Sequence, residues 1–451
     1  MLARRVVCSD VFWEMVAIDA FEGYNFFCKK AFDRWEAAEE KQGQCAGEEK
    51  ENMGGKKENK GITICYSLIQ GFFWMSFAAA MGFSSVYLLE CGLTSSQIGL
   101  ILAVSGIAAS IMQPVVASYA DHPSALSLKW IVLLVCALAF LASIVLLAVY
   151  QKSVILTGIF YGCCAAFLQF LMPFINSLGT EMIRQGARLN WGLARGLGSI
   201  AYAMISYVLG ILAATAGVMV VPVSIMVGYG LLFAGVLIYP FYQRKERAKK
   251  TVDNPKSLSS AAFLRKYPRF AAVLGGTVLL YVSHVLLNNF LYQIIQAKGG
   301  GSTEVGFVMS LCAWVELPSM FLFSYMLKKA GSDVWYRICG IFMAVKAIAS
   351  LLAPSLPVYY LVQVLQLAGW GLIAIAPIYY VNRVIGSEDA IKGQAYIGMS
   401  YTVASVLASM VGGWLIDLAG VPALLLLASF VGVAGAVVVI VFTERIEQRE
   451  K

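Results

Sequence analysis

Residues 421–443 read VPALLLLASFVGVAGAVVVIVFT, a stretch of 23 residues without a charged side chain. A helix rises about 1.5 Å per residue, so about 20 apolar residues cross the roughly 30 Å hydrocarbon core of a bilayer. A stretch this long predicts a transmembrane helix, because a membrane-spanning strand would instead alternate apolar and polar residues over about ten positions.

Eleven more apolar stretches precede this one, and short loops join most of them. We therefore expect an all-α polytopic membrane protein with twelve transmembrane helices. An even number of spans places both termini on one side of the membrane. The expected spans are residues 62–89, 97–120, 126–149, 153–180, 191–213, 218–241, 270–296, 304–327, 334–353, 357–382, 392–416 and 421–443.

The composition of the chain indicates the same class. Of its 451 residues, 59% are hydrophobic and 13% are charged, whereas a soluble domain is about 45–50% apolar and about 25% charged. Residues 61–451 hold 24 basic and 14 acidic side chains, too few to coat a soluble globule of that size. These numbers exclude a soluble enzyme, a secreted disulfide scaffold and a disordered chain.

Lysine and arginine are distributed unevenly between the two sets of loops. The set that includes residues 243–269 carries 17 of them, nine within that loop, and the opposite set carries only Lys152 and Lys298. Because cytoplasmic loops collect basic residues, this asymmetry predicts that both termini are cytoplasmic. The net charge of +8 is then a sign of orientation, and no nucleic-acid partner is expected.

The basic loop also divides the chain. We expect six-helix bundles at residues 61–242 and 270–443, joined by a cytoplasmic loop at 243–269 and followed by a cytoplasmic tail at 444–451. Residues 1–60 have two interpretations. They form a charged cytoplasmic extension with an aromatic helix, or translation starts at Met53 and residues 1–52 are not part of the native protein.

Metal ligands are not grouped in this sequence. The chain has ten cysteines and two histidines, and they form neither a Cys-x-x-Cys pair nor a cysteine–histidine cluster. We therefore expect no metal site and no other cofactor.

Several motifs carry a family resemblance. The end of the second span, QPVVASYAD at residues 113–121, is similar to the signature between spans 2 and 3 of the major facilitator superfamily. More specific stretches resemble the lactose-permease-like branch, which includes oligosaccharide and phenylpropionate symporters. They are YLLECGLTSSQIG at 87–99, NWGLARGLGSIAY at 190–202, WVELP at 314–318 and the pair Val345–Lys346.

The resemblance implies the major facilitator fold and roles for particular residues. By that likeness Arg195 contacts substrate, Tyr202 stacks on it, and Glu316 links substrate to a proton, while Lys346 matches an arginine of the branch. The sequence also departs from lactose permease. It has Asn176 in place of a glutamate, no aspartates at 282–285, and Gln366 and Gly369 in place of a histidine and a glutamate. The resemblance therefore implies neither a galactoside substrate nor that protein's proton route.

Four charged or polar side chains within spans have both a functional and a structural interpretation. A charge in hydrocarbon costs roughly 2.5–3.5 kcal/mol on insertion scales. Glu316 and Lys346 lie near mid-depth, where they form either a proton-coupling carboxylate beside a substrate-binding cation or a buried ion pair. Arg195 and Asn176 flank one loop and are expected to bind substrate, unless Arg195 extends to the membrane surface.

Further candidate site residues are those that could titrate near neutral pH, bond a substrate or stack on its ring. His284 is a candidate for proton coupling and Asn288, one turn later, for substrate binding; the alternative is a helix-to-helix hydrogen bond. Asp121 is expected in an inner gate, or else is a solvated loop residue. The remaining candidates are the aromatic residues Trp74, Tyr202, Trp314 and Trp370, which would stack on a ring, and the amides Gln70, Gln366 and Gln394, which would line a cavity.

Together these features predict a secondary active transporter that moves a small organic solute, sugar-like or an organic acid, by alternating access with proton symport. Two alternatives remain open: a proton-coupled antiporter that exports lipophilic compounds, and a sensor that binds solute without moving it. An enzyme is not expected, because no nucleophile–base pair or phosphate loop accompanies the spans. The expected setting is a prokaryotic cytoplasmic membrane, with a monomer that contacts lipid, protons and a small-molecule substrate.

Overall fold

The computed structural model describes residues 60–120, 122, 125–150, 152–241, 260–386 and 388–445. Within these residues the chain is helical and contains no strand. Several sequence predictions lie outside the described residues: the extension before Lys60 with its alternative start at Met53, the gate residue Asp121, most of the basic loop, and the last six residues of the tail.

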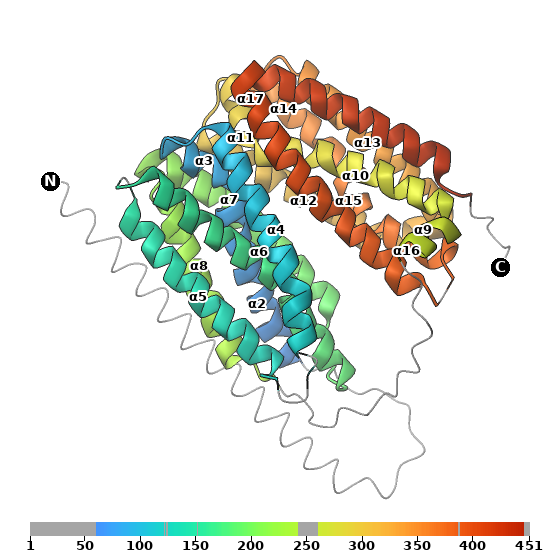
Figure 1. The fold of residues 1–451 in the computed structure, drawn as a ribbon, viewed down its shortest axis with the longest axis horizontal. Coiled ribbons are helices and arrows are strands. Elements are labelled where there is room, and N and C mark those ends of the chain that lie inside the picture. Colours follow the sequence, from blue (N-terminus) through green and yellow to red (C-terminus); the bar gives the residue numbers. More distant parts are fainter. Residues whose placement is uncertain are drawn as a thin grey trace, which may run out of the picture.

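The first group of helices corresponds to the first six predicted spans and is coloured blue to green in Figure 1. The first span is made of three pieces, and each later span is one helix. The elements are α2 (Lys60–Phe77), the π-helix η1 (Ala78–Gly82), α3 (Ser84–Glu90), α4 (Ser95–Ala120), α5 (Leu128–Val149), α6 (Val154–Arg184), α7 (Trp191–Ala216) and α8 (Val220–Ile238).

The second group, yellow to red in Figure 1, lies beside the first. It begins with a short helix, α9 (Ser260–Lys266), that precedes the seventh span. The other elements are α10 (Pro268–Asn289), α11 (Leu291–Ala297), α12 (Ser302–Lys329), α13 (Ser332–Leu352), α14 (Leu356–Gln363), the 3₁₀-helix η2 (Val364–Leu367), α15 (Trp370–Ile373), α16 (Ala376–Val384) and α17 (Ala390–Phe442).

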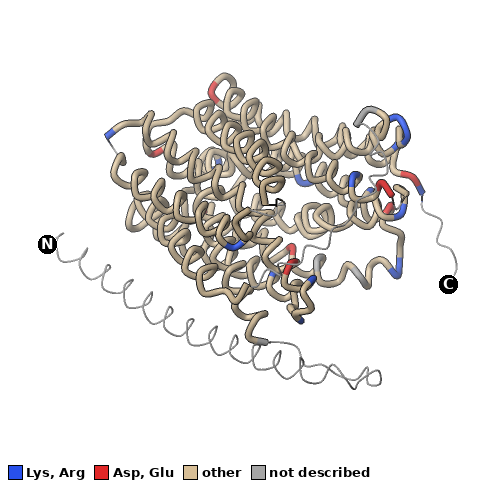
Figure 2. The backbone as a smooth tube through the Cα atoms, turned by 60° about the horizontal axis from the view of Figure 1, so that its bottom comes forward, with Lys and Arg blue, Asp and Glu red and all other residues tan. Residues whose placement is uncertain are grey.

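Eleven helical stretches among the described residues are long and apolar enough to cross a membrane. The last of them, α17, contains two helices separated at Gly420, whose φ of 78° favours glycine. This kink divides α17 into the eleventh and twelfth predicted spans, so the protein has twelve transmembrane helices in two six-helix bundles. Figure 2 shows charged residues as short coloured stretches on a tube that is mostly tan.

Three spans that the sequence predicts as continuous are interrupted. A π-helix breaks the first, Phe290 separates α10 from α11 in the seventh, and the tenth is divided into α14, η2, α15 and α16. Hydropathy averaged over a span is insensitive to such breaks because most of the residues in them remain apolar. Non-α backbone at membrane depth is tolerated where it is buried in protein or lines a cavity, and both η1 and η2 contribute residues to the cavity described below.

The bundles meet most tightly at the end where α4 begins, which we call the closed end. A Cβ atom on Gly99 of α4 would overlap the carbonyl oxygen of Ser409 on α17, and one on Gly413 would overlap that of Ser95. These glycines let the two backbones touch. A hydrogen bond of 2.7 Å from Ser85 Oγ to the carbonyl oxygen of Asn289 also joins the bundles.

A carboxylate of one bundle caps a helix of the other at the closed end. The backbone N–H groups of Ser95 and Ser96 donate to Oδ1 and Oδ2 of Asp417, at 3.1 and 2.7 Å. The first N–H groups of a helix have no partner within the helix, and its N-terminus attracts negative charge. Asp417 on α17 therefore stabilises the N-terminus of α4 only while the bundles are together at this end.

We call the opposite end the open end, and large apolar side chains are exposed there. Val115 of α4 is 65% exposed, Phe321 of α12 64% and Ile391 of α17 85%. The bundles also diverge toward this end in Figure 1. The short helix α9 is fixed here by Lys266, whose Nζ donates to Asp389 Oδ2 at 2.8 Å; this bond raises the pKa of Lys266 and lowers that of Asp389.

We expect Asp417→Ala to weaken the closed end. The N–H groups of Ser95 and Ser96 bond Asp417 only while the bundles are together, so the substitution removes an interaction that only the closed state has. Hydrogen bonds to charged groups contribute about 1.5–3 kcal/mol each, so the loss of these two should raise the fraction of molecules open at this end by at least about tenfold. The measurement is alkylation of Cys312, which lines the cavity, by a membrane-impermeant maleimide added on the closed side, in a variant whose other cysteines are replaced.

The control is Glu90→Ala, which removes an exposed carboxylate at the same end. The Glu90 variant should be alkylated at the unmodified rate. Equal rates for the Asp417 and Glu90 variants would contradict the capping role of Asp417.

Candidate functional site

A cavity of about 480 Å³ lies between the two bundles at mid-depth. This volume falls in the range of about 300–1,000 Å³ that small-molecule sites occupy. The first bundle contributes residues from α2, η1, α4, α6 and α7, and the second from α10, α11, α12, α13, α14, η2, α15 and α17. Both bundles therefore hold whatever fills it.

Arg195 forms the basic wall of the first bundle. It lies on α7, and Cζ of its guanidinium is 4.0 Å from the centroid of the Trp74 ring on α2. Nη1 donates to Ser199 Oγ at 3.2 Å. A guanidinium carries five N–H donors, so others remain available to a ligand in the cavity. Tyr202, one turn beyond Ser199, meets Trp74 edge to face with ring centroids 6.4 Å apart.

Asn176 does not line the cavity with Arg195, although the sequence predicts that both do. Its Oδ1 accepts a hydrogen bond of 3.2 Å from Gln70 Nε2, and Gln70 is fully buried. The depth of the two residues could be read from the chain, but the direction of each side chain depends on how α2, α6 and α7 pack. Gln70 likewise lies behind the cavity wall rather than in it.

Glu316 of α12 and Lys346 of α13 lie in the second bundle and are connected by an amide. Gln366 Nε2 donates to Glu316 Oε1 at 2.8 Å, and Gln366 Oε1 accepts from Lys346 Nζ. All three residues line the cavity. The structure therefore brings the predicted carboxylate and cation to one place, joined through a neutral side chain of η2 rather than as a direct ion pair.

An aromatic wall stands beside this bridge. The His284 ring stacks on Trp370 with centroids 3.8 Å apart and an angle of 3° between the planes. Asn288 Nδ2 lies 2.9 Å from His284 Nε2, an arrangement that requires an unprotonated Nε2 because an amide nitrogen only donates. Tyr281 and Tyr401 contact Trp370 with centroids 5.9 and 5.8 Å away.

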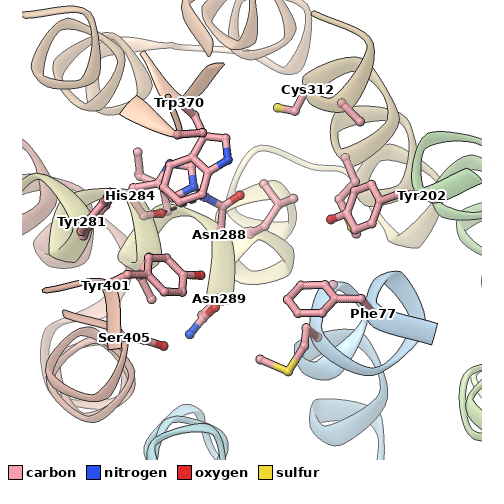
Figure 3. Close-up of a pocket in the computed structure, with 18 of the residues that line it drawn as sticks. Phe77, Tyr202, Tyr281, His284, Asn288, Asn289, Cys312, Trp370, Tyr401 and Ser405 are labelled. Atoms are coloured by element: carbon pink, nitrogen blue, oxygen red, sulfur yellow. Dashed lines mark hydrogen bonds between the residues drawn. The ribbon is translucent and has the colours of Figure 1, made fainter. Parts of the chain in front are cut away.

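Figure 3 shows how the two walls face each other. Tyr202 and Phe77 of the first bundle lie on one side, and His284, Trp370 and Tyr401 of the second lie on the other. A planar ring bound in this space would therefore have aromatic side chains on both sides of it. The polar atoms of Asn288, Asn289 and Ser405 lie along the same region.

Most of the predicted site residues line the cavity, and four of those that the structure describes do not. Arg195, Tyr202, Asn288, Lys346, Trp74, Glu316 and His284 are in its wall, as are Trp370 and Gln366. Trp314 is 48% exposed and outside the wall, and Gln394 bonds Asn382 at the open end. Asn176 and Gln70 lie behind Arg195.

Sequence reasoning missed several lining residues. Tyr281 and Tyr401 are not distinguished from the other 20 tyrosines by composition, although both occur within spans, where a polar hydroxyl needs a partner. Gln113 and Gln169 are further polar lining residues, and Gln169 Nε2 donates to Ser105 Oγ at 3.1 Å. A polar amide within an apolar run is the signal that identifies them.

We expect Gln366→Leu to lower the thermal midpoint of the purified protein. Lys346 is only 6% exposed, and the substitution removes the acceptor of its ammonium group and the donor to Glu316. Leaving a buried polar group unpaired costs about 1–3 kcal/mol, and more for a charged group. The measurement is thermal unfolding in detergent micelles.

Two comparisons complete this test. Gln394→Leu removes an amide at the exposed open end and should change the midpoint little. Gln366→Leu combined with Lys346→Met and Glu316→Gln should recover stability, since no charge then remains unpaired. A Gln366→Leu variant as stable as the Gln394→Leu variant would contradict the bridge.

Comparison with known proteins agrees with this geometry. Residues 64–426 match the model of the MFS_1 like family. The chain is 23% identical over 386 residues to the maltose permease of Geobacillus stearothermophilus, covering 84% of this chain and 94% of the relative. It is 24% identical over 376 residues to the probable 3-phenylpropionic acid transporter of Escherichia coli (strain K12), covering 80% and 96%.

Solved structures show the same fold. A mutant form of the nucleoside transporter NupG superposes with a TM-score of 0.71 and 15% identity, covering 85% of this chain and 99% of NupG. A bacterial homologue of the iron transporter ferroportin, in an inward-facing state, gives a TM-score of 0.67 at 15% identity, covering 86% and 100%. The match of the family model over most of the chain decides the assignment: this protein belongs to the MFS_1 like family and is a multi-pass membrane transporter of small solutes.

Proposed function

We propose that this protein moves a small organic anion together with a proton, by alternating access of the cavity to the two sides of the membrane. The observation that carries the proposal is the set of charges in the cavity wall. Among the described residues, that wall holds two basic side chains, Arg195 and Lys346, and one carboxylate, Glu316. An empty cavity with all three ionised has one uncompensated positive charge, which an anion balances.

Arg195 is suited to hold a carboxylate. Its planar fork of N–H groups matches two carboxylate oxygens, and stacking on Trp74 leaves the edge of the fork free. The aromatic residues opposite, Trp370 and Tyr401, offer faces to an apolar ring. A ring-bearing monocarboxylate fits this arrangement, and the name of the Escherichia coli relative, a probable 3-phenylpropionic acid transporter, supports it.

Glu316 is the candidate proton carrier. Its bond to Gln366 is charge-assisted while the carboxylate is ionised and weakens when a proton neutralises it. Protonation therefore changes the bridge to Lys346 as well as the net charge of the cavity. His284, stacked on Trp370 in the same wall, is a second candidate station for the proton.

A neutral sugar is the second candidate solute. The maltose permease relative supports it, and so do the amide and hydroxyl groups of Asn288, Gln113 and Ser405 in the wall, which match sugar hydroxyls. For either solute we propose that the open end faces the cytoplasm, since the basic loops lie at that end, and that the membrane is the cytoplasmic membrane of a prokaryote.

The first test is proton flux in liposomes that carry the purified protein and an internal pH dye. Wild-type protein should acidify the lumen when 3-phenylpropionate is added outside at pH 6, and Glu316→Gln should abolish this signal while keeping exchange of labelled solute. Glu304→Gln is the matched control, because Glu304 lies on the same helix and caps its start outside the cavity.

Other outcomes of this experiment would support one of the two alternative functions. Solute-dependent proton release from the lumen would indicate an antiporter, and solute binding without flux would indicate a sensor. Full proton flux in Glu316→Gln would refute the role of this carboxylate.

The second test separates the two solute classes. Arg195→Lys replaces a fork of donors by a single ammonium, so the KM for 3-phenylpropionate should rise about tenfold, which corresponds to about 1.4 kcal/mol. Arg188→Lys, in the exposed connection between α6 and α7, should leave KM unchanged. Transport of maltose, with no loss in Arg195→Lys, would instead support the sugar.

A further inference from the structure

Behind the basic wall of the cavity lies a chain of hydrogen bonds between neutral side chains. Its centre is Gln70 of α2, whose side chain is fully buried and does not line the cavity. Gln70 Nε2 donates to Tyr66 OH at 2.8 Å and to Asn176 Oδ1 at 3.2 Å. Gln70 Oε1 accepts from Trp74 Nε1 at 3.2 Å.

These bonds allow only one orientation of the amide. An indole N–H is a donor without acceptor capacity, so the oxygen of Gln70 must face Trp74. The nitrogen then faces Asn176 and Tyr66, and the Tyr66 hydroxyl donates onward to the carbonyl oxygen of Ile175 at 3.1 Å. Both donors of Gln70 are used, so the amide connects α2 to α6 and holds the indole of Trp74 by its only polar atom.

Trp74 is also confined at the carbon next to its N–H group. A Cβ atom on Gly198 of α7 would lie 2.7 Å from Trp74 Cδ1, closer than real contacts allow. Glycine at this position therefore makes room for the ring. With its N–H bonded to Gln70 and its edge against Gly198, the plane of Trp74 is determined, and the guanidinium of Arg195 lies over that plane at 4.0 Å.

We propose that Gln70 is a positioning residue for anion binding: by fixing the plane of Trp74, it holds the Arg195 guanidinium where the solute meets it. This inference rests on the proposed role of Arg195. Asn176 acts one step further back, as the acceptor that orients Gln70. The sequence predicts Arg195 and Asn176 as two substrate ligands. In this proposal Arg195 alone binds the solute, and Asn176 helps to position it.

The first arm of the test needs no solute. The measurement is the NMR signal of the indole N–H groups in the full chain, nitrogen-labelled at its tryptophans and placed in lipid nanodiscs. The chain has nine tryptophans, and the signal of Trp74 is identified as the one lost in Trp74→Phe. Arg195→Gln should shift that signal, because a cation leaves the ring face. In a Gln70→Leu background the same substitution should produce less than about half of that shift, since the ring and the guanidinium are no longer aligned.

The second arm measures transport of 3-phenylpropionate. Gln70→Leu should raise KM about tenfold and leave the maximal rate within about twofold, because Glu316 and the closed end are untouched. Trp74→Phe keeps a ring but removes the N–H, and should raise KM similarly; the double variant should be no worse than either single one, as expected for residues that act as one unit.

Two further variants guard against a loss of folding. Gln70→Leu with Asn176→Leu removes the amide that Gln70→Leu alone would leave without its donor, and should show the same rise in KM. Gln293→Leu is the matched control, since Gln293 is buried outside the cavity and its amide has no hydrogen bond among the described residues. It should leave KM unchanged.

Equal shifts of the Trp74 signal in both backgrounds would overturn the positioning role, as would a fall in maximal rate at constant KM in Gln70→Leu. If wild-type protein does not transport 3-phenylpropionate, the proposed solute is wrong, and the indole signal still decides whether Gln70 positions Arg195. The two failures are therefore distinguishable.

Discussion

A polar group inside the hydrocarbon layer has no water to bond, so it must find its partner within the protein. This constraint explains the arrangement of both walls of the cavity. In each bundle a basic residue faces the cavity, and in each a glutamine supplies the bonds that the surrounding helices do not. Gln366 connects Lys346 to Glu316 directly, whereas Gln70 acts on Arg195 through the ring of Trp74.

A neutral amide has a property in these positions that a charged residue lacks. It donates and accepts at once, so it satisfies two groups without adding a charge that must itself be neutralised. A direct Glu316–Lys346 ion pair would cancel the charges on which the proposed binding of an anion and transfer of a proton depend. The intervening Gln366 keeps both ions in the wall and leaves their balance sensitive to a proton or an anion.

The sequence predicted the class and the positions of the spans because hydropathy over 20 residues is a strong physical signal. It did not predict the breaks at Ala78–Gly82, Phe290 and Val364–Leu367, since the mean hydropathy of a span changes little across them even where Gln366 is present. In the same way Arg195, Glu316 and Lys346 could be singled out because charges in spans are rare. The side-chain directions of Asn176 and Gln70, and the inclusion of Tyr281 and Tyr401 in the wall, depend on helix packing that no single span contains.

The π-helix of the first span lies between two helical segments that make different contacts. Before it, Trp74 is fixed against Gln70 and Gly198; after it, Ser85 is fixed against the carbonyl of Asn289 at the closed end. A π-turn contains one residue more than an α-turn, so winding the same residues of Ala78–Gly82 as unbroken α-helix would rotate the face after them by about 100° relative to the face before them. The π-helix thus lets a single span make both contacts, and a homologue of the same length with an unbroken α-helix here would have to give up one of them.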